Sequence, residues 1–170
     1  MTDQNGGNGF QAQFHTLART ILDKAPSNCL GPGAAAAQIL ETELALGVRL
    51  PASYKCFLAE FGWAAWPEEI AGVTSMPTGY ENVDERARLE REDAEPEMRR
   101  HLVPFYNDGW GNHYCLDTSR FEGDECPVVF WNQELEAEQA PVVVCGSFVE
   151  WLVGMAKEML EWEREGRLEG

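Results

Sequence analysis

Apolar residues recur at helical spacing in three segments of the N-terminal half. The first segment predicts an amphipathic helix that stops before Pro26, because its apolar side chains recur three and four residues apart. These side chains are Phe10, Phe14, Leu17, Ala18, Ile21 and Leu22. Residues 34–46 predict a second helix that buries Ile39, Leu40 and Leu44, and Gly47 is placed to end it in a left-handed cap.

A third helix is expected to begin at Pro51. Proline suits the first helical position because the N–H that it lacks would be unpaired there. Gly62 marks the expected end of this helix. Its predicted inner face consists of Tyr54, Phe57, Leu58 and Phe61.

Alternation of aromatic and branched residues predicts a β-hairpin between residues 102 and 120. Its turn contains Asp108, Gly109, Trp110, Gly111 and Asn112. The glycines, with Asn and Asp beside them, supply the positive-φ positions of a tight or bulged turn. Trp110 stands at the tip, and it either folds back over the core, which we favour, or contacts a ligand.

Three further short runs read as strands, and the chain closes with a helix. The strands are expected at residues 69–73, 127–131 and 141–145, rich in branched side chains. Ser147 and Glu150 form a capping box, in which each side chain accepts a hydrogen bond from the other's backbone N–H. The closing helix is expected to bury Phe148, Trp151, Leu152, Met155 and Met159.

This order of elements predicts an α+β fold: one domain with a largely antiparallel or mixed sheet and helices packed on one side. Residues 1–9 are expected to form a disordered Gly/Asn tail, followed by a single domain over residues 10–166. Residues 81–100 contain eight acidic residues and five arginines with little apolar periodicity. We expect them to form a solvated insertion, at about residues 80–100, of exposed helix and loop.

Four sequence blocks in a fixed order resemble the SUKH superfamily. They are ELALGVRLPASYKCFLAEFG (residues 43–62), the DGWGNHYCLD hairpin (108–117), PVVFWNQE (127–134) and SFVEWL (147–152). The superfamily groups fungal cell-wall regulators with bacterial immunity proteins that neutralise toxins. The resemblance implies the same α+β arrangement, a structural role for Asp117, and a place in the immunity-protein branch.

The composition is acidic, with 13 basic and 29 acidic residues and a formal net charge of −16. Such a surface repels nucleic acid, which is bound through lysine and arginine, and attracts basic proteins. Five cysteines without C-x-x-C spacing, and a start without a signal-peptide pattern, indicate a reduced, cytoplasmic protein. No apolar run approaches the ~20 residues of a membrane helix.

His113, Cys115 and Asp117 are the strongest catalytic candidates, because a thiol, a base and an orienting carboxylate form a hydrolase set. They alternate along one strand, so their side chains project in parallel about 6–7 Å apart and do not converge. We therefore expect no catalytic residue here, and Asp117 is expected to bond the backbone of the following turn.

The sequence does not support a metal or cofactor site either. The three histidines are unpaired at helical spacing, and Glu134, Glu136 and Glu138 lack the glycine and the further ligands of a calcium loop. Phosphate-cradling glycine motifs are absent from the sequence. We expect neither a metal nor a cofactor.

A stretch from Phe121 to Ala156 contains seven acidic residues and no lysine or arginine. Acidic charge around exposed aromatic anchors suits the fast capture of a basic protein. The alternative, that these acids only solubilise turns, remains open. The candidate partner-binding residues are Asp108, Trp110, Glu122, Asp124, Glu125, Glu134, Glu136 and Glu138, and the candidate structural residues are Gly109, Gly111, Asn112, Asp117, Ser147, Glu150 and Trp151.

Three functions are consistent with these patterns. The first is a non-enzymatic immunity protein that occludes a basic, nuclease-type or other polymorphic toxin domain stoichiometrically. The second is a regulatory scaffold of the cell-wall-signalling type. The third, which is the least favoured, is a hydrolase that uses a cysteine or a carboxylate pair.

Overall fold

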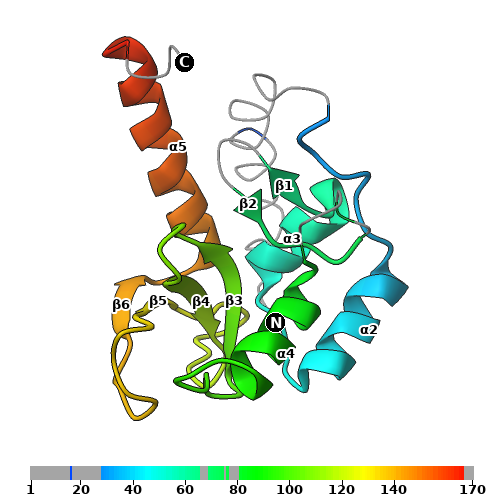
Figure 1. Ribbon diagram of the computed structural model, residues 1–170. Coiled ribbons are helices and arrows are strands. Elements are labelled where there is room, and N and C mark those ends of the chain that lie inside the picture. Colours follow the sequence, from blue (N-terminus) through cyan, green and yellow to red (C-terminus); the bar gives the residue numbers. More distant parts are fainter. Residues whose placement is uncertain (1–15, 17–27, 66–68, 75, 77–80, 167–170) are drawn as a thin grey trace.

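The computed structural model describes residues 16, 28–65, 69–74, 76 and 81–166. The expected tail, and the expected N-terminal helix apart from Thr16, lie outside these residues. The described elements (Figure 1) are α2 (Ala36–Leu46), α3 (Ala52–Phe61), β1 (Ala64–Ala65), β2 (Glu69–Ile70), α4 (Val83–Glu92), β3 (Leu102–Asn107), β4 (His113–Asp117), β5 (Val128–Trp131), β6 (Val142–Cys145) and α5 (Phe148–Arg164).

The strands form an antiparallel sheet in which neighbours in sequence are neighbours in space, in the order β1-β2-β3-β4-β5-β6. This confirms the predicted α+β fold. The hairpin is also confirmed, as β3 and β4 pair from Leu102 opposite Asp117 to Asn107 opposite His113. The expected strand at residues 69–73 is shorter than predicted, and its partner β1 was not predicted, since two alanines carry no alternating pattern.

Adjacent residues of a strand point to opposite faces of the sheet, so the side chains of Cys115 and Leu116 lie on different faces. Leu116 belongs to the main core, together with Val103 and Phe105 and with the buried side chains of α3 and α5. Cys115 belongs to a smaller cluster with Leu102, Val129, Trp131 and Met98. Met98 comes from the segment that follows α4, so this segment covers part of the second face.

Aromatic rings hold α5 against the sheet. The Phe148 ring centroid lies 5.0 Å from that of Tyr54 on α3 and 5.2 Å from that of Phe105 on β3. Trp151, one helical turn on, lies 4.8 Å from Phe105 in an edge-to-face arrangement. The predicted burial of Phe148 and Trp151 is confirmed.

Only one of the two hydrogen bonds of the predicted capping box forms at the start of α5. Ser147 Oγ accepts a hydrogen bond from the Glu150 N–H at 3.3 Å, as expected. The Glu150 carboxylate, however, accepts from the N–H of Gly146 at 2.8 Å rather than from Ser147. The carboxylate therefore reaches past the cap residue and fixes the chain before the helix.

The other two predicted helices are present with small corrections. Gly47 ends α2 in the left-handed region, as expected, but Leu40 and Leu44 are exposed. Ile39 is buried as predicted, and Thr42 and Leu46 are buried with it, because among the described elements α2 packs against α3 and α4. Pro51 is the N-cap of α3 rather than its first residue.

Residues 81–100, expected to form a solvated insertion of exposed helix and loop, are only partly solvated, since Val83, Arg86, Ala87 and Met98 are buried. The helix α4 forms, but Val83 and Ala87 join the main core, and the buried Arg86 pairs with Glu69 of β2. Arg91 donates hydrogen bonds to the carbonyls of Leu46 and Leu102, at 3.1 Å and 3.0 Å. The charges misled the sequence interpretation because long arginine side chains can lie within a core interface when the guanidinium finds carboxylate or carbonyl partners there.

No helix within the described ranges is long and apolar enough to cross a membrane.

The packing of α5 makes a prediction for stability. Trp151→Ala removes a buried indole and should lower the free energy of unfolding by about 3–5 kcal/mol. Ser147→Ala removes only the cap and should cost about 1 kcal/mol. Urea denaturation of the two variants measures the difference, and a neutral Trp151→Ala variant would contradict the packing of α5 on the sheet.

Candidate partner-binding site

The turn of the β3–β4 hairpin is held by its own polar residues. Gly109 and Gly111 have φ of 81° and 87°, a region that side-chain-bearing residues rarely adopt. Asp108 Oδ1 accepts hydrogen bonds from the N–H groups of Trp110, at 2.8 Å, and Asn112, at 3.1 Å. Burial raises the pKa of Asp108, but these bonds and one from the Asn112 side chain outweigh it and hold the pKa below its ordinary value.

Trp110 points into solvent, with 81% of its surface exposed. The interpretation that this indole folds back over the core is therefore wrong. The turn extends beyond the paired residues of β3 and β4, so the side chain meets little of the protein. An exposed indole on a rigid turn is well suited to contact a partner, since few of its own degrees of freedom are lost on binding.

The loop between β5 and β6 lies against this turn. Gln133 donates from its backbone N–H to Asn112 Oδ1 at 3.1 Å, and from its side-chain amide to the Trp110 carbonyl. Gln139 closes the loop on Asn132, with bonds of 3.1 Å and 2.8 Å. Sequence reasoning missed these three residues, although the polar pair that follows β5 was a usable signal.

These contacts divide the predicted acidic residues into two groups. Asp108 and Trp110 lie at the same end of the sheet as the exposed Glu134, Glu136 and Glu138, because the β3–β4 and β5–β6 connections share one end of an antiparallel meander. We call Trp110, Asp108 and these three glutamates the tip surface.

The β4–β5 turn, with the remaining acids, lies at the opposite end. Glu125 accepts hydrogen bonds from the backbone N–H and the hydroxyl of Ser53, at 2.8 Å and 2.6 Å, and so caps α3. Asp124 pairs with Arg49 at 3.2 Å. Burial raises the pKa of Glu125, against the effect of the bonds from Ser53. The structure therefore does not bring Glu122, Asp124 and Glu125 together with the tip surface.

A row of apolar side chains runs across the sheet next to the tip. Tyr106 of β3 lies beside Tyr114 of β4, with ring centroids 5.5 Å apart, and Tyr114 lies 5.3 Å from Phe130 of β5. Val142 of β6 pairs with Phe130 and is 67% exposed. We call these four residues the aromatic strip. Its three rings are only partly buried.

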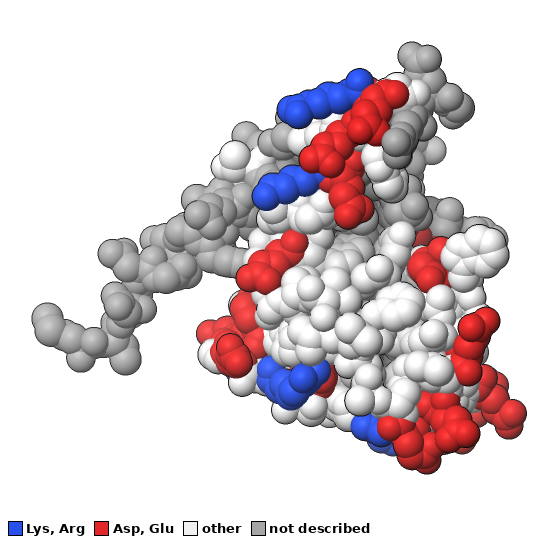
Figure 2. All heavy atoms as spheres, turned by 90° about the vertical axis from the view of Figure 1, so that its left-hand side faces the viewer, with Lys and Arg blue, Asp and Glu red and all other residues white. Residues whose placement is uncertain are grey.

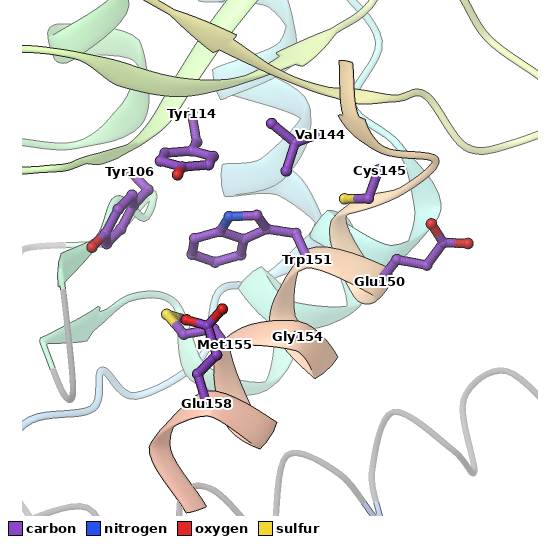
Figure 3. Close-up of a pocket in the computed structure, with 9 residues that line it drawn as sticks. All are labelled: Tyr106, Tyr114, Val144, Cys145, Glu150, Trp151, Gly154, Met155 and Glu158. Atoms are coloured by element: carbon purple, nitrogen blue, oxygen red, sulfur yellow. The ribbon is translucent and has the colours of Figure 1, made fainter. Parts of the chain in front are cut away.

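A pocket of about 320 Å³ lies between the aromatic strip and α5 (Figure 3). The Trp151 indole stands between the two tyrosines and the start of α5. Burial raises the pKa of Tyr114, and the charges of Asp108 and Glu158 raise it further. The lining residues are Tyr106, Tyr114, Val144, Cys145, Glu150, Trp151, Gly154, Met155 and Glu158.

Figure 2 shows the face of the molecule that carries α5 and β6. Uncharged atoms occupy its centre, and the charged side chains around its edge are mostly acidic. An uncharged centre with a charged rim is compatible with a protein-binding surface.

The three candidate catalytic side chains have separate partners. Cys115 is fully buried beside Met98, and burial raises the pKa of its thiol well above the ordinary value. His113 Nε2 lies 3.1 Å from a carboxylate oxygen of Glu90, and Asp117 accepts hydrogen bonds from Ser119 and Arg120. A buried thiol with a raised pKa is a poor nucleophile, so this arrangement does not support catalysis.

Across the described part of the chain, no group of three or more His, Cys, Asp or Glu side chains is arranged to hold a metal ion.

Fold and surface together describe a small α+β protein with an acidic, aromatic face. The model of the SMI1 / KNR4 family (SUKH-1) matches residues 33–154, and the chain belongs to this family. It is therefore of the immunity-protein or cell-wall-regulator type, whose members are generally non-enzymatic. A comparison with curated proteins found no match.

The contacts of Asp117 predict a pH dependence of stability. Burial raises the pKa of this carboxyl, but the bonds from Ser119 and Arg120 outweigh it and lower the pKa below its ordinary value. The resulting stabilisation is present above the unfolded pKa of about 3.9 and is lost as the pH falls through the folded value. Asp117→Asn should therefore be less stable at neutral pH and lose less stability on further acidification.

Urea denaturation between neutral and acidic pH measures this effect. The matched control is Asp124→Asn, since Asp124 is an exposed carboxylate at the same end of the sheet. Identical pH profiles for Asp117→Asn and the unmodified protein would contradict the prediction.

Proposed function

We propose that this protein is an immunity protein of the bacterial branch, which binds a basic toxin domain in the cytoplasm and neutralises it by stoichiometric occlusion. The proposal rests on one observation. The exposed Trp110 and the acidic loop of residues 132–141 lie together at one end of the sheet, next to the aromatic strip. Family membership supplies the functional class.

Trp110 is the anchor of the proposed interface. Exposed tryptophan is among the residues that contribute most to protein association when a partner surrounds it and excludes water. The turn that carries Trp110 is fixed by Asp108 and Gln133, so little order has to be gained on binding.

Charge supports a basic partner. The tip surface and the neighbouring rim are acidic, and the stretch from residue 121 to 156 carries no positive side chain. Nucleases and other enzymes that act on nucleic acid have basic substrate grooves, because phosphate binding requires lysine and arginine. An acidic protein that covers such a groove competes directly with the substrate.

The neighbouring gene provides the test. We expect a gene beside this one to encode a secreted protein with a variable C-terminal toxin domain. That domain, expressed with this protein, should purify as an equimolar complex and lose its toxicity. Survival of toxicity in a complex that forms, or failure of the two proteins to associate, would contradict the proposal.

Trp110→Ala tests the anchor. Because the side chain is exposed, the substitution should change the free energy of unfolding by less than about 0.5 kcal/mol. It should weaken toxin binding by about 30-fold, which corresponds to about 2 kcal/mol. Calorimetric titration measures the affinity, and Leu44→Ala on α2 is the control, since this exposed apolar residue lies away from the tip surface.

Reversal of Glu134, Glu136 and Glu138 to lysine tests the role of charge. The triple variant should associate with the toxin domain more slowly, and salt should reduce the association rate of the unmodified protein more than that of the variant. Stopped-flow measurements at several salt concentrations follow both effects.

The matched control reverses three exposed acids away from the tip, Glu41, Glu122 and Asp124, and so changes the net charge equally. Equal association rates and salt slopes for the two triple variants would place the interface elsewhere.

A further inference from the structure

Strand β6 is an open edge of the sheet. Within the described residues it pairs with β5 and has no strand on its other side. Val142, Val143 and Val144 are 67%, 50% and 45% exposed. Edge strands present unpaired N–H and C=O groups along their outer side, where a further strand can add.

The strand itself carries none of the charged residues that normally prevent strand addition. Proteins protect exposed edges with lysine, inward-pointing charge, proline or a bulge. Here Pro141 precedes the strand, and the register shifts by one residue opposite Val128 and Val129, but the strand itself consists of three valines and Cys145. An uncharged, β-branched edge is favourable for pairing with another extended chain.

The pocket lies directly beside this edge. Val144 and Cys145 form one wall of it, and Trp151 and Met155 of α5 lie across from them (Figure 3). A strand that pairs with β6 would point every second side chain to the same face of the sheet as this pocket. One apolar side chain of an added strand can therefore enter the cavity.

The acidic residues around the pocket and the edge indicate which kind of chain would bind there. Glu150 and Glu158 line the pocket, and the exposed Glu134, Glu136 and Glu138 lie in the loop that leads into β6. A second copy of this chain would bring the same acids together and is therefore disfavoured. A segment with lysine or arginine between apolar residues would complement both the charges and the valines.

We propose that a basic, extended segment of the protein partner adds to β6 as a further antiparallel or parallel strand and inserts one apolar side chain into the pocket. This inference rests on the proposed function, since it assigns to the toxin domain the segment that docks here. It extends the interface from the tip surface along the free edge of the sheet.

Hydrogen exchange of the backbone amides in the toxin complex is the first test. Amides of residues 142–145 that face outward should exchange at least about tenfold more slowly in the complex than in the free protein. Val144→Lys should weaken binding, because it introduces a positive charge at the edge, whereas Leu44→Lys, the same change on α2, should not. A complex that forms without protection of residues 142–145 overturns the strand addition and leaves the proposed function standing.

Failure of the toxin domain to bind would contradict the proposed function. In that case a synthetic peptide still tests whether a strand can add to β6. The probe is an eight-residue peptide of alternating valine and lysine, and its control has the same sequence with alternate amides N-methylated. The unmodified peptide should protect residues 142–145, and the N-methylated peptide should not. Equal effects of the two peptides, or no protection by either, overturn the proposal.

Pairing of β6 with a second copy of this protein is the alternative that remains to be tested. Analytical ultracentrifugation of the free protein should show a monomer over the concentrations used. A dimer that dissociates on Val144→Lys but not on Leu44→Lys would assign the edge to a second copy and overturn the assignment to a partner segment.

Discussion

The aromatic cluster between the sheet and helices α3 and α5 is the contact on which the rest of the structure depends. Phe148 packs between Tyr54 and Phe105, and the Tyr54 hydroxyl donates a hydrogen bond to the Ala71 carbonyl at 2.6 Å. One residue cluster thus joins α3, the β2–β3 region and α5. It also fixes the line along which α5 crosses the sheet, and the part of the sheet beyond that line, with Tyr114 at its border against Trp151, is only partly covered.

The candidate binding surface follows from this partial coverage. Had α5 covered Tyr114 and Phe130 completely, the aromatic strip would be core. Instead these rings form the floor of an open face, and polar contacts, not apolar packing, position the loops around it. Gln133 joins the two loops, and Asp108 shapes the turn that presents Trp110. Rigid loops beside an open apolar floor are the features that the proposed toxin recognition uses.

The acidic and basic residues fall into two groups according to burial. Arg86 and Arg91 are held within interfaces and tie α4 to the sheet and to α2. Glu125 caps α3 from the β4–β5 turn. Glu134 and its exposed neighbours have no comparable structural contact among the described residues, so their charge is available to a partner. Net charge alone could not separate these roles, because it counts every residue equally.

Local pattern was sufficient for most of the elements, though not for β1: the alternation around the hairpin, the glycines of its turn, the period of α5 and its Ser147 cap were all read from sequence. These features depend on neighbours within a few residues. The positions of Trp110, of the acids at opposite ends of the sheet, and of the face that α4 buries depend on contacts between distant segments. A charged helix and a turn tryptophan each have two stable environments, buried or exposed, and only the tertiary packing around them selects one.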